Sequence, residues 1–213
     1  NAEGDLYRYG KTSLAIADLF KTQVPGVENV VRHQVWGVDI KRNDNSFESA
    51  AMMVDPNFFD VFSFKVLMGD ASEIKDPRKI VLNEWTANAF FGDEHPIGQQ
   101  LKMRVYAEDL TFEVAAVIEG HPDNSSLRPE IVINYEVIER QLNAETTNVH
   151  TFIELNKSTR VSSLEGPLAA LAERKSELTP DKPYESISLE PLTTMSSKNG
   201  KEIISGIGGA PPP

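Results

Sequence analysis

The side chains in this sequence that could do chemistry begin with four histidines. They are His33, His95, His121 and His150, and no two of them share the spacing of a helical metal motif or a zinc-binding motif. Histidines this isolated are most often surface residues or hydrogen-bonded structural residues. They therefore predict no metal site.

A run of aspartates, Asp55, Asp60, Asp70 and Asp76, is the second candidate. Their spacing is not that of an EF-hand loop, and each aspartate has a local role open to it as a turn residue, a helix cap or a solvated charge. Carboxylates that act as an acid–base pair are brought together by the fold, so such a pair cannot be read from sequence. A hydrolytic enzyme with an assembled carboxylate site stays open as one hypothesis.

The sequence signatures of several enzyme classes are missing. There is no Gly-x-Ser-x-Gly elbow, and the Gly-Lys pairs at residues 10–11 and 200–201 lack the upstream glycine of a phosphate-binding loop. The glycines at 206–209 do not stand between a strand and a helix. With no cysteine, the chain has no disulfide, cysteine–zinc site or thiol nucleophile. We predict that it is not an enzyme, with no catalytic, cofactor-binding or metal-binding residues and no cofactor.

Composition limits the class of partner. The 213 residues carry a net charge of −11, with 40% hydrophobic and 25% charged residues, as in an ordinary folded domain. Basic residues are scattered, whereas nucleic acids and anionic lipid surfaces attract clusters of Lys and Arg. No apolar stretch approaches the roughly 20 residues that span a bilayer. We expect no nucleic-acid partner and interpret the chain as a fragment cut from a longer protein.

Helices and strands alternate at the ends of the chain, and hairpins dominate its middle. Helical spacing is seen at 12–24, 136–142 and 164–178, and strand patterns are seen at 30–40, 47–54, 80–82, 99–105, 110–119, 130–135, 151–155 and 187–192. This pattern predicts an α+β fold. We expect two subdomains, one built from 1–70 plus 147–195 and the other an inserted, more β-rich unit of 71–146. Residues 196–213, rich in Gly, Ser and Pro, are predicted to be a linker or disordered tail.

The stretch Met52–Gly92 is a compact scaffold around aromatic side chains. Four phenylalanines lie between Phe58 and Phe64, and core packing is a commoner use of such a run than a ligand groove or partner surface. Asn83 is placed to cap the helix that follows it, and Gly92 to end that helix in the left-handed region.

The same stretch resembles a known family. The segments Phe58–Phe64, Gly69-Asp70, Ile80–Ala87 and Phe91–Gly98 are similar, in order and spacing, to motifs of the extracytoplasmic core domain of MacB-like and FtsX-like ABC-transporter permeases. Two weaker similarities flank them, at Val24–Glu28 and at Phe112–Glu119, where Ala116 replaces the usual glycine. The similar region extends over residues 5–195.

The resemblance implies a non-catalytic periplasmic domain on the outer face of the bacterial inner membrane. It implies a porter-like α/β subdomain with a β-rich insertion, and transmembrane helices before and after this fragment. The partners it implies are a cytoplasmic ATPase subunit or domain, a periplasmic protein partner or cargo, and a second copy in a homodimeric transporter. Motion of the membrane helices would then be coupled to the periplasmic partner. The alternative from another class is a free periplasmic or secreted ligand-binding module whose aromatic run lines a pocket.

Overall fold

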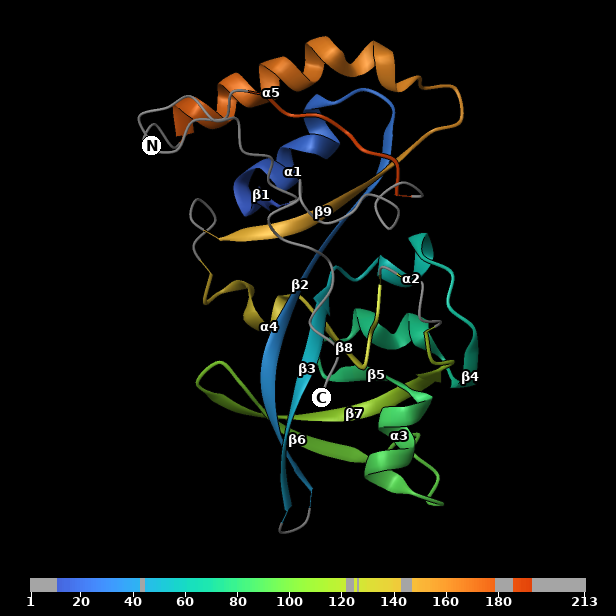
Figure 1. Ribbon diagram of the computed structural model, residues 1–213. Coiled ribbons are helices and arrows are strands. Elements are labelled where there is room, and N and C mark those ends of the chain that lie inside the picture. The colour runs from blue at the N-terminus through green and yellow to red at the C-terminus, as the bar shows by residue number, and fades with distance from the viewer. Residues whose placement is uncertain are drawn as a thin grey trace. The chain divides into compact units, whose positions relative to one another are not determined.

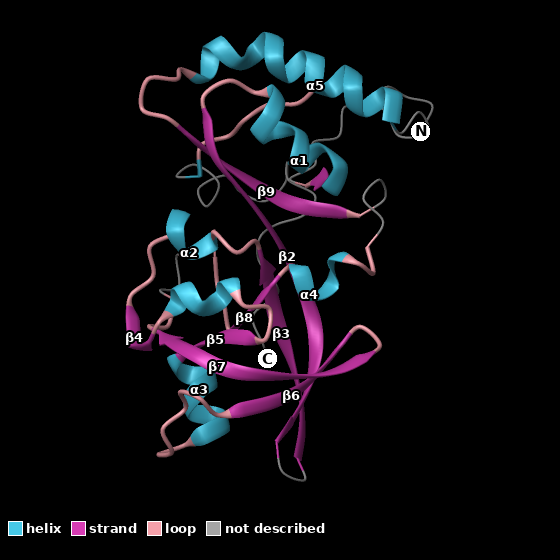
Figure 2. Cartoon of the chain, turned by 180° about the vertical axis from the view of Figure 1, so that it is seen from behind, coloured by secondary structure: helices cyan, strands magenta, loops and turns pink. Residues whose placement is uncertain are grey.

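The computed structural model describes residues 11–42, 45–121, 125, 127–142, 147–178 and 186–192. The predicted α+β class is confirmed, because helices pack beside a mixed sheet of parallel and antiparallel strands (Figures 1 and 2).

The chain divides into two compact units. Unit 1 comprises residues 1–30, 123–127 and 143–213, and unit 2 comprises residues 31–122 and 128–142. Both end segments of the chain thus belong to unit 1. The predicted division at residues 70 and 147 stays a prediction, and the compact units divide the chain much earlier, at Val31. The difference arises because the strand at 45–54 pairs with the strand at 131–134, a contact that sequence pattern does not reveal.

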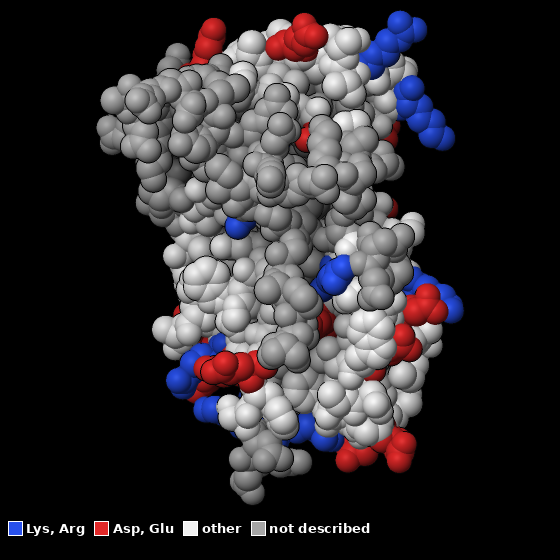
Figure 3. Space-filling view, viewed as in Figure 1, with Lys and Arg blue, Asp and Glu red and all other residues white. Residues whose placement is uncertain are grey.

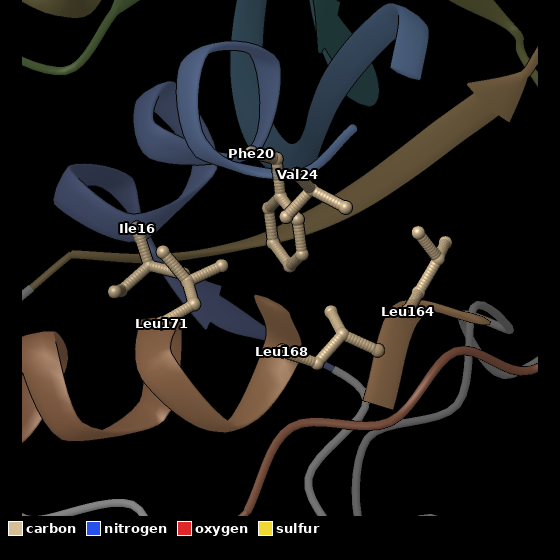
Figure 4. Close-up of a cluster of buried hydrophobic side chains, with 6 residues drawn as sticks. All are labelled: Ile16, Phe20, Val24, Leu164, Leu168 and Leu171. Atoms are coloured by element: carbon tan, nitrogen blue, oxygen red, sulfur yellow. The ribbon is translucent and has the colours of Figure 1, made fainter. Parts of the chain in front are cut away.

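The described part of unit 1 includes two helices and two strands that pair with each other. Helix α1 (Leu14–Gln23) and helix α5 (Glu165–Leu178) pack together, and β1 (Thr12–Ser13) pairs with β9 (Asn148–Leu155). A 3₁₀ turn, η2 (Val161–Leu164), leads into α5. Apolar side chains from both ends of the chain form one buried cluster (Figure 4), made of Ile16, Phe20, Val24, Leu164, Leu168 and Leu171.

Helix α1 follows from the spacing of its apolar residues. Ile16 and Phe20 lie one turn apart and are both buried, so the helix presents one face to the cluster. The chain then turns at Pro25 and at Gly26, whose φ of 79° lies in the left-handed region. A side chain at Gly26 would overlap Thr159, so the turn is fitted closely against the segment that precedes η2.

Unit 2 contains a closed ring of six strands. In ring order these strands pair β2–β3–β8–β5–β7–β6, and β6 pairs back with β2. Their bounds are β2 (Val27–Arg42), β3 (Asn45–Val54), β5 (Lys79–Asn83), β6 (Gln100–Val105), β7 (Glu108–Ile118) and β8 (Ile131–Asn134). Strand β2 begins in unit 1, and residues 31–42 belong to unit 2.

The inside of this ring is filled with apolar side chains. Directly paired residues share a face of a sheet, and the paired rows are apolar. Ile80 pairs with both Val114 and Ile133, and Ile40 pairs with Met103, and all five are at most 1% exposed. The ring is therefore a packed core and not a channel.

Shorter elements complete unit 2. They are the helices α2 (Phe58–Val61), α3 (Glu84–Phe91) and α4 (Glu136–Glu139), the 3₁₀ turn η1 (Ala71–Lys75) and the strand β4 (Val66–Gly69). Strand β4 pairs with β7 and ends the order of strands, which makes it an edge strand. The predicted strand at 187–192 is wrong, because none of the described residues 186–192 is in a strand. Ile187 and Leu189 pack against the cluster of unit 1 without joining a ladder.

Asn83 caps α3, as the sequence predicted. Its side-chain oxygen accepts a hydrogen bond from the Thr86 backbone N–H at 2.7 Å, and its side-chain nitrogen donates to the Pro129 carbonyl at 3.1 Å. Gly92 ends the helix with a φ of 58°, again as predicted.

Replacement of Asn83 by alanine is expected to lower the free energy of unfolding by about 1–2 kcal/mol, because the cap and a buried hydrogen bond are lost together. Urea denaturation followed by tryptophan fluorescence measures the change. Asn88→Ala is the matched control, because Asn88 is exposed in the middle of the same helix. If both variants are equally stable, Asn83 does not hold the start of α3.

Candidate partner-binding surface

The histidines do not come together as a site. His33 on β2 is buried in unit 2 and His150 on β9 is buried in unit 1, whereas His95 is exposed and His121 is half-buried. Over the described part of the chain, no group of three or more His, Asp or Glu side chains could hold a metal ion.

The aspartate run is used for local structure. Three of the four aspartates are bound by a neighbouring donor, namely Asp60 by Lys75 at 3.1 Å, Asp70 by the Ser72 N–H at 2.8 Å, and Asp76 by Arg78 at 3.0 Å. The hydrogen bonds from Ser72 and Arg78 hold the pKa values of Asp70 and Asp76 below the ordinary value. Asp70 caps η1, and Asp60 and Asp76 form surface ion pairs.

Asp55 forms several hydrogen bonds with Arg32. It accepts hydrogen bonds from the Arg32 backbone N–H at 2.7 Å and from two guanidinium nitrogens of Arg32, the shorter at 2.7 Å. The guanidinium also lies 4.9 Å from the ring centre of Tyr135 and 3.4 Å from Glu139. Burial raises the pKa of the Tyr135 hydroxyl, which stays protonated. This pair ties the start of unit 2 in β2 to the end of β3.

The aromatic run lies around one buried ring. Phe58 is fully buried, and the ring centres of Phe59, Phe62 and Phe64 lie 5.1, 5.0 and 5.5 Å from it. The run packs on itself, and only the three outer rings are partly exposed. This geometry agrees with core packing. The chain continues from the aromatic run directly into β4.

Two tryptophans are exposed on unit 2. The Trp36 ring on β2 is stacked on the Tyr106 ring, with centres 4.5 Å apart and planes 10° apart. Tyr106 has a φ of 55°, which is unfavourable for a non-glycine residue and is offset here by the stack. Trp85 is 53% exposed and lies edge-on to His121. Neither residue was singled out from sequence as a surface residue, because tryptophan is usually expected to be buried.

Strand β4 adds a row of exposed apolar side chains. Val66, Leu67 and Met68 are 42%, 39% and 38% exposed. The strand ends at Gly69, which has a φ of 74°, and an added β-carbon there would lie 2.0 Å from the Ala115 carbonyl oxygen. Only glycine therefore lets β4 approach β7 this closely. No strand was predicted at 66–69, although apolar residues next to a glycine were a signal that could have revealed one.

Replacement of Gly69 by alanine is expected to lower the free energy of unfolding by roughly 2 kcal/mol or more, because left-handed backbone alone costs about 1–2 kcal/mol and the new methyl group strikes the β7 backbone. Hydrogen exchange of the Asp70 amide, which donates to Ala115 O, should accelerate with it. Gly37→Ala is the control, because a β-carbon at Gly37 meets nothing within 4 Å. An unchanged exchange rate in Gly69→Ala would contradict the close fit of β4.

Charge on the described surface is mixed. In the space-filling view, Lys and Arg side chains lie beside Asp and Glu side chains over the lower part of the face shown (Figure 3). Ion pairs among the described residues include Lys65–Glu119 and Arg104–Asp109. The surface therefore presents apolar rings and an open strand edge between compensated charges, which suits contact with another protein better than contact with a polyanion.

Comparison with known proteins gives one family and several similar folds. The family model of the MacB-like periplasmic core domain matches residues 3–171. A domain described as part of a permease protein from Porphyromonas gingivalis has a TM-score of 0.67 and 20% identity, and the match covers 89% of this chain and 87% of that one. A search of curated proteins gave no match.

Two further solved structures are similar. The periplasmic region of MacB from Actinobacillus actinomycetemcomitans has a TM-score of 0.61 and 15% identity, over 92% of this chain and 87% of that chain. The extracellular domain of the noncanonic ABC-type transporter YknZ from Gram-positive bacteria has a TM-score of 0.60 and 14% identity, over 85% and 91%. At these identities the structures show a shared fold. In the described residues no helix has the length and apolar character to cross a membrane.

Proposed function

Because the chain belongs to the family of MacB-like periplasmic core domains, we propose that it is the non-catalytic extracytoplasmic domain of an ABC-transporter permease. Transmembrane helices on both sides would hold it at the outer face of the inner membrane. A cytoplasmic ATPase would drive those helices, and the domain would pass their motion to a periplasmic partner or cargo. A homodimeric transporter would carry two copies.

The observation that carries this proposal is that the described segments nearest the two ends of the sequence, 11–30 and 186–192, both belong to unit 1. A domain inserted between two membrane helices needs its entry and its exit in one body, so that both helices act on the same structure. Helix α1 follows the entry and helix α5 precedes the exit, and their buried side chains form one cluster. A displacement of either membrane helix would therefore move α1 and α5 together.

Unit 2 supports a binding role in the same scheme. The chain leaves unit 1 along β2 and forms a ring of strands with a filled interior, a rigid body whose exposed rings and strand edge face solvent. The aspartates Asp60, Asp70 and Asp76 are engaged in a cap and in ion pairs, which supports a mechanical role over a reaction.

The proposed location of the domain outside the cytoplasm can be tested with single introduced cysteines, because the chain has no cysteine of its own. Lys102→Cys in unit 2 and Glu173→Cys in unit 1 replace exposed residues. In an intact permease without other cysteines, both positions should react with a membrane-impermeant maleimide applied to spheroplasts. A cysteine in a cytoplasmic loop of the permease is the control and should react only after the membrane is permeabilised. If positions 102 and 173 react with the maleimide only after the membrane is permeabilised, the proposal is overturned.

The same experiment separates the permease from a free periplasmic binding module. A permease domain sediments with the membrane fraction after labelling, whereas a free module is released with the periplasmic contents.

A further inference from the structure

The proposed function gives unit 2 a binding role, and the open edge of β4 indicates what unit 2 could bind. Strand β4 ends the order of strands and pairs with β7, and within the described residues no strand lies on its outer side (Figures 1 and 2). Proteins usually protect such an edge with charges, proline or a covering segment. Here the three residues Val66, Leu67 and Met68 are apolar and exposed.

The backbone of this edge has polar groups directed outward. The Lys65 carbonyl accepts from the Glu119 N–H at 2.8 Å, so Lys65 faces β7 with its backbone. Successive residues of a strand direct their N–H and C=O groups to opposite sides. The N–H and C=O of Val66 therefore point away from β7, where a further strand could bind them.

The length of the β4 edge and the charges beside it indicate which kind of molecule would bind there. Four residues span about 13 Å, so pairing of this strand alone buries far less than the roughly 1,200 Å² of a stable self-association. Lipid cannot satisfy the outward backbone groups. Lys65 stands before the strand and pairs with Glu119 at 2.6 Å, and Asp70 stands after it and accepts the Ser72 N–H, but both side chains stay exposed. A strand running antiparallel to β4 is therefore favoured when it carries a basic residue at its start, beside Asp70, and an acidic residue at its end, beside Lys65.

We propose that β4 is a docking edge to which an extended segment of a partner protein, basic at its start, acidic at its end and β-branched between, adds as an antiparallel strand. That this partner is a periplasmic component of the transporter rests on the proposed function. The binding chemistry itself rests on β4 alone.

The test uses a labelled model strand, acetyl-Lys-Thr-Val-Thr-Val-Glu-amide, and its charge-reversed form, acetyl-Glu-Thr-Val-Thr-Val-Lys-amide, with fluorescence anisotropy on the whole chain. The first peptide should bind saturably and about tenfold more tightly than the second. Absence of saturable binding, or equal binding of both peptides, would overturn the proposal. The result does not depend on membrane topology, so it can fail while the proposed function holds, or succeed while the maleimide experiment fails.

Two variants locate the binding. Val66→Pro removes the outward N–H and leaves the β7 ladder intact, and it should weaken binding about tenfold. Leu67→Asp places a charge on the edge and should have a similar effect if the proline variant does not fold. Val66→Ala keeps the donor and is the matched control, with binding changed by less than about threefold. Unchanged binding in a folded Val66→Pro or Leu67→Asp variant would overturn the assignment to β4.

Other occupants give different results. Sedimentation of the chain alone should show a monomer, and a dimer that Val66→Pro abolishes would replace the partner segment by a second copy. A chain ending at Leu192 should bind the peptide as the full chain does. Tighter binding by the shortened chain would mean that residues 193–213 occupy the edge, which would also overturn the proposal.

Discussion

Replacement of Asp55 by alanine is expected to lower the free energy of unfolding of unit 2 by about 3–5 kcal/mol, because it leaves a charged and largely buried guanidinium without its main partner. The side chains of Arg32 and Asp55 are only 14% and 10% exposed. Asp55 also receives the Arg32 backbone N–H, which becomes unsatisfied in the variant. Tryptophan fluorescence measures the change in urea, since Trp36 and Trp85 both lie in unit 2.

Asp76→Ala is the matched control for the loss of an ion pair. Its partner Arg78 is 84% exposed, so the variant should change stability by less than about 1 kcal/mol. A double variant, Arg32→Met with Asp55→Leu, should recover much of the stability lost in Asp55→Ala, because an apolar pair of similar size removes the uncompensated charge. If Asp55→Ala and Asp76→Ala cost the same, the pair does not anchor β2 to β3.

The second large effect is expected in unit 1. Phe20→Ala should lower the free energy of unfolding by about 3–5 kcal/mol, because it opens a cavity in the cluster that joins α1 to α5. Phe20 is 2% exposed and belongs to that cluster. Far-ultraviolet circular dichroism follows the change, since α1 and α5, the two longest helices of the described chain, lie in unit 1.

Val161→Ala is the control in the same unit. Val161 is 49% exposed, so its truncation should change stability by no more than about 0.5 kcal/mol. The loss in Phe20→Ala should also release the mechanical link between the chain ends on which the proposed function depends. A Phe20→Ala variant as stable as Val161→Ala would show that the α1–α5 cluster does not hold unit 1 together.

The elements with strong local signals were predicted from sequence. Helix α1 follows from its apolar spacing and the Pro-Gly stop, the β2–β3 hairpin from two strands around an Asn-rich turn, and α3 from Asn83 and Gly92 at its ends. These signals lie within a few residues of one another, so they can be recognised in the sequence without knowledge of distant contacts.

Features that depend on distant contacts were not predicted. The parallel pairing of β3 with β8 joins Ala51 to Ile131 and draws residues 31–70 into unit 2, and no local pattern encodes it. Residues 187–192 have a strand-like pattern but form no strand. The apolar side chains of Ile187 and Leu189 pack instead against the buried cluster of unit 1.

The candidate surface was foreseen only in part. The expectation that the phenylalanines pack on one another agrees with the buried ring of Phe58. Asp55 was expected to have a local role. Its bonds to Arg32 were not foreseen, because they join residues that lie far apart in the sequence. Strand β4 was missed because an exposed edge strand with apolar side chains on both faces lacks the alternation that marks a half-buried strand.

The proposed function requires that the domain moves when the cytoplasmic ATPase closes. Glu173 lies on the exposed face of α5, and Glu173→Cys gives one spin-label site per copy. Pulsed electron paramagnetic resonance on the intact permease with its ATPase, in lipid nanodiscs, measures the distance between the two copies. We expect the distribution of distances between the two spin labels to shift when ATP and vanadate trap the closed ATPase. The same distribution in the nucleotide-free and trapped states, in a transporter that hydrolyses ATP, would contradict it.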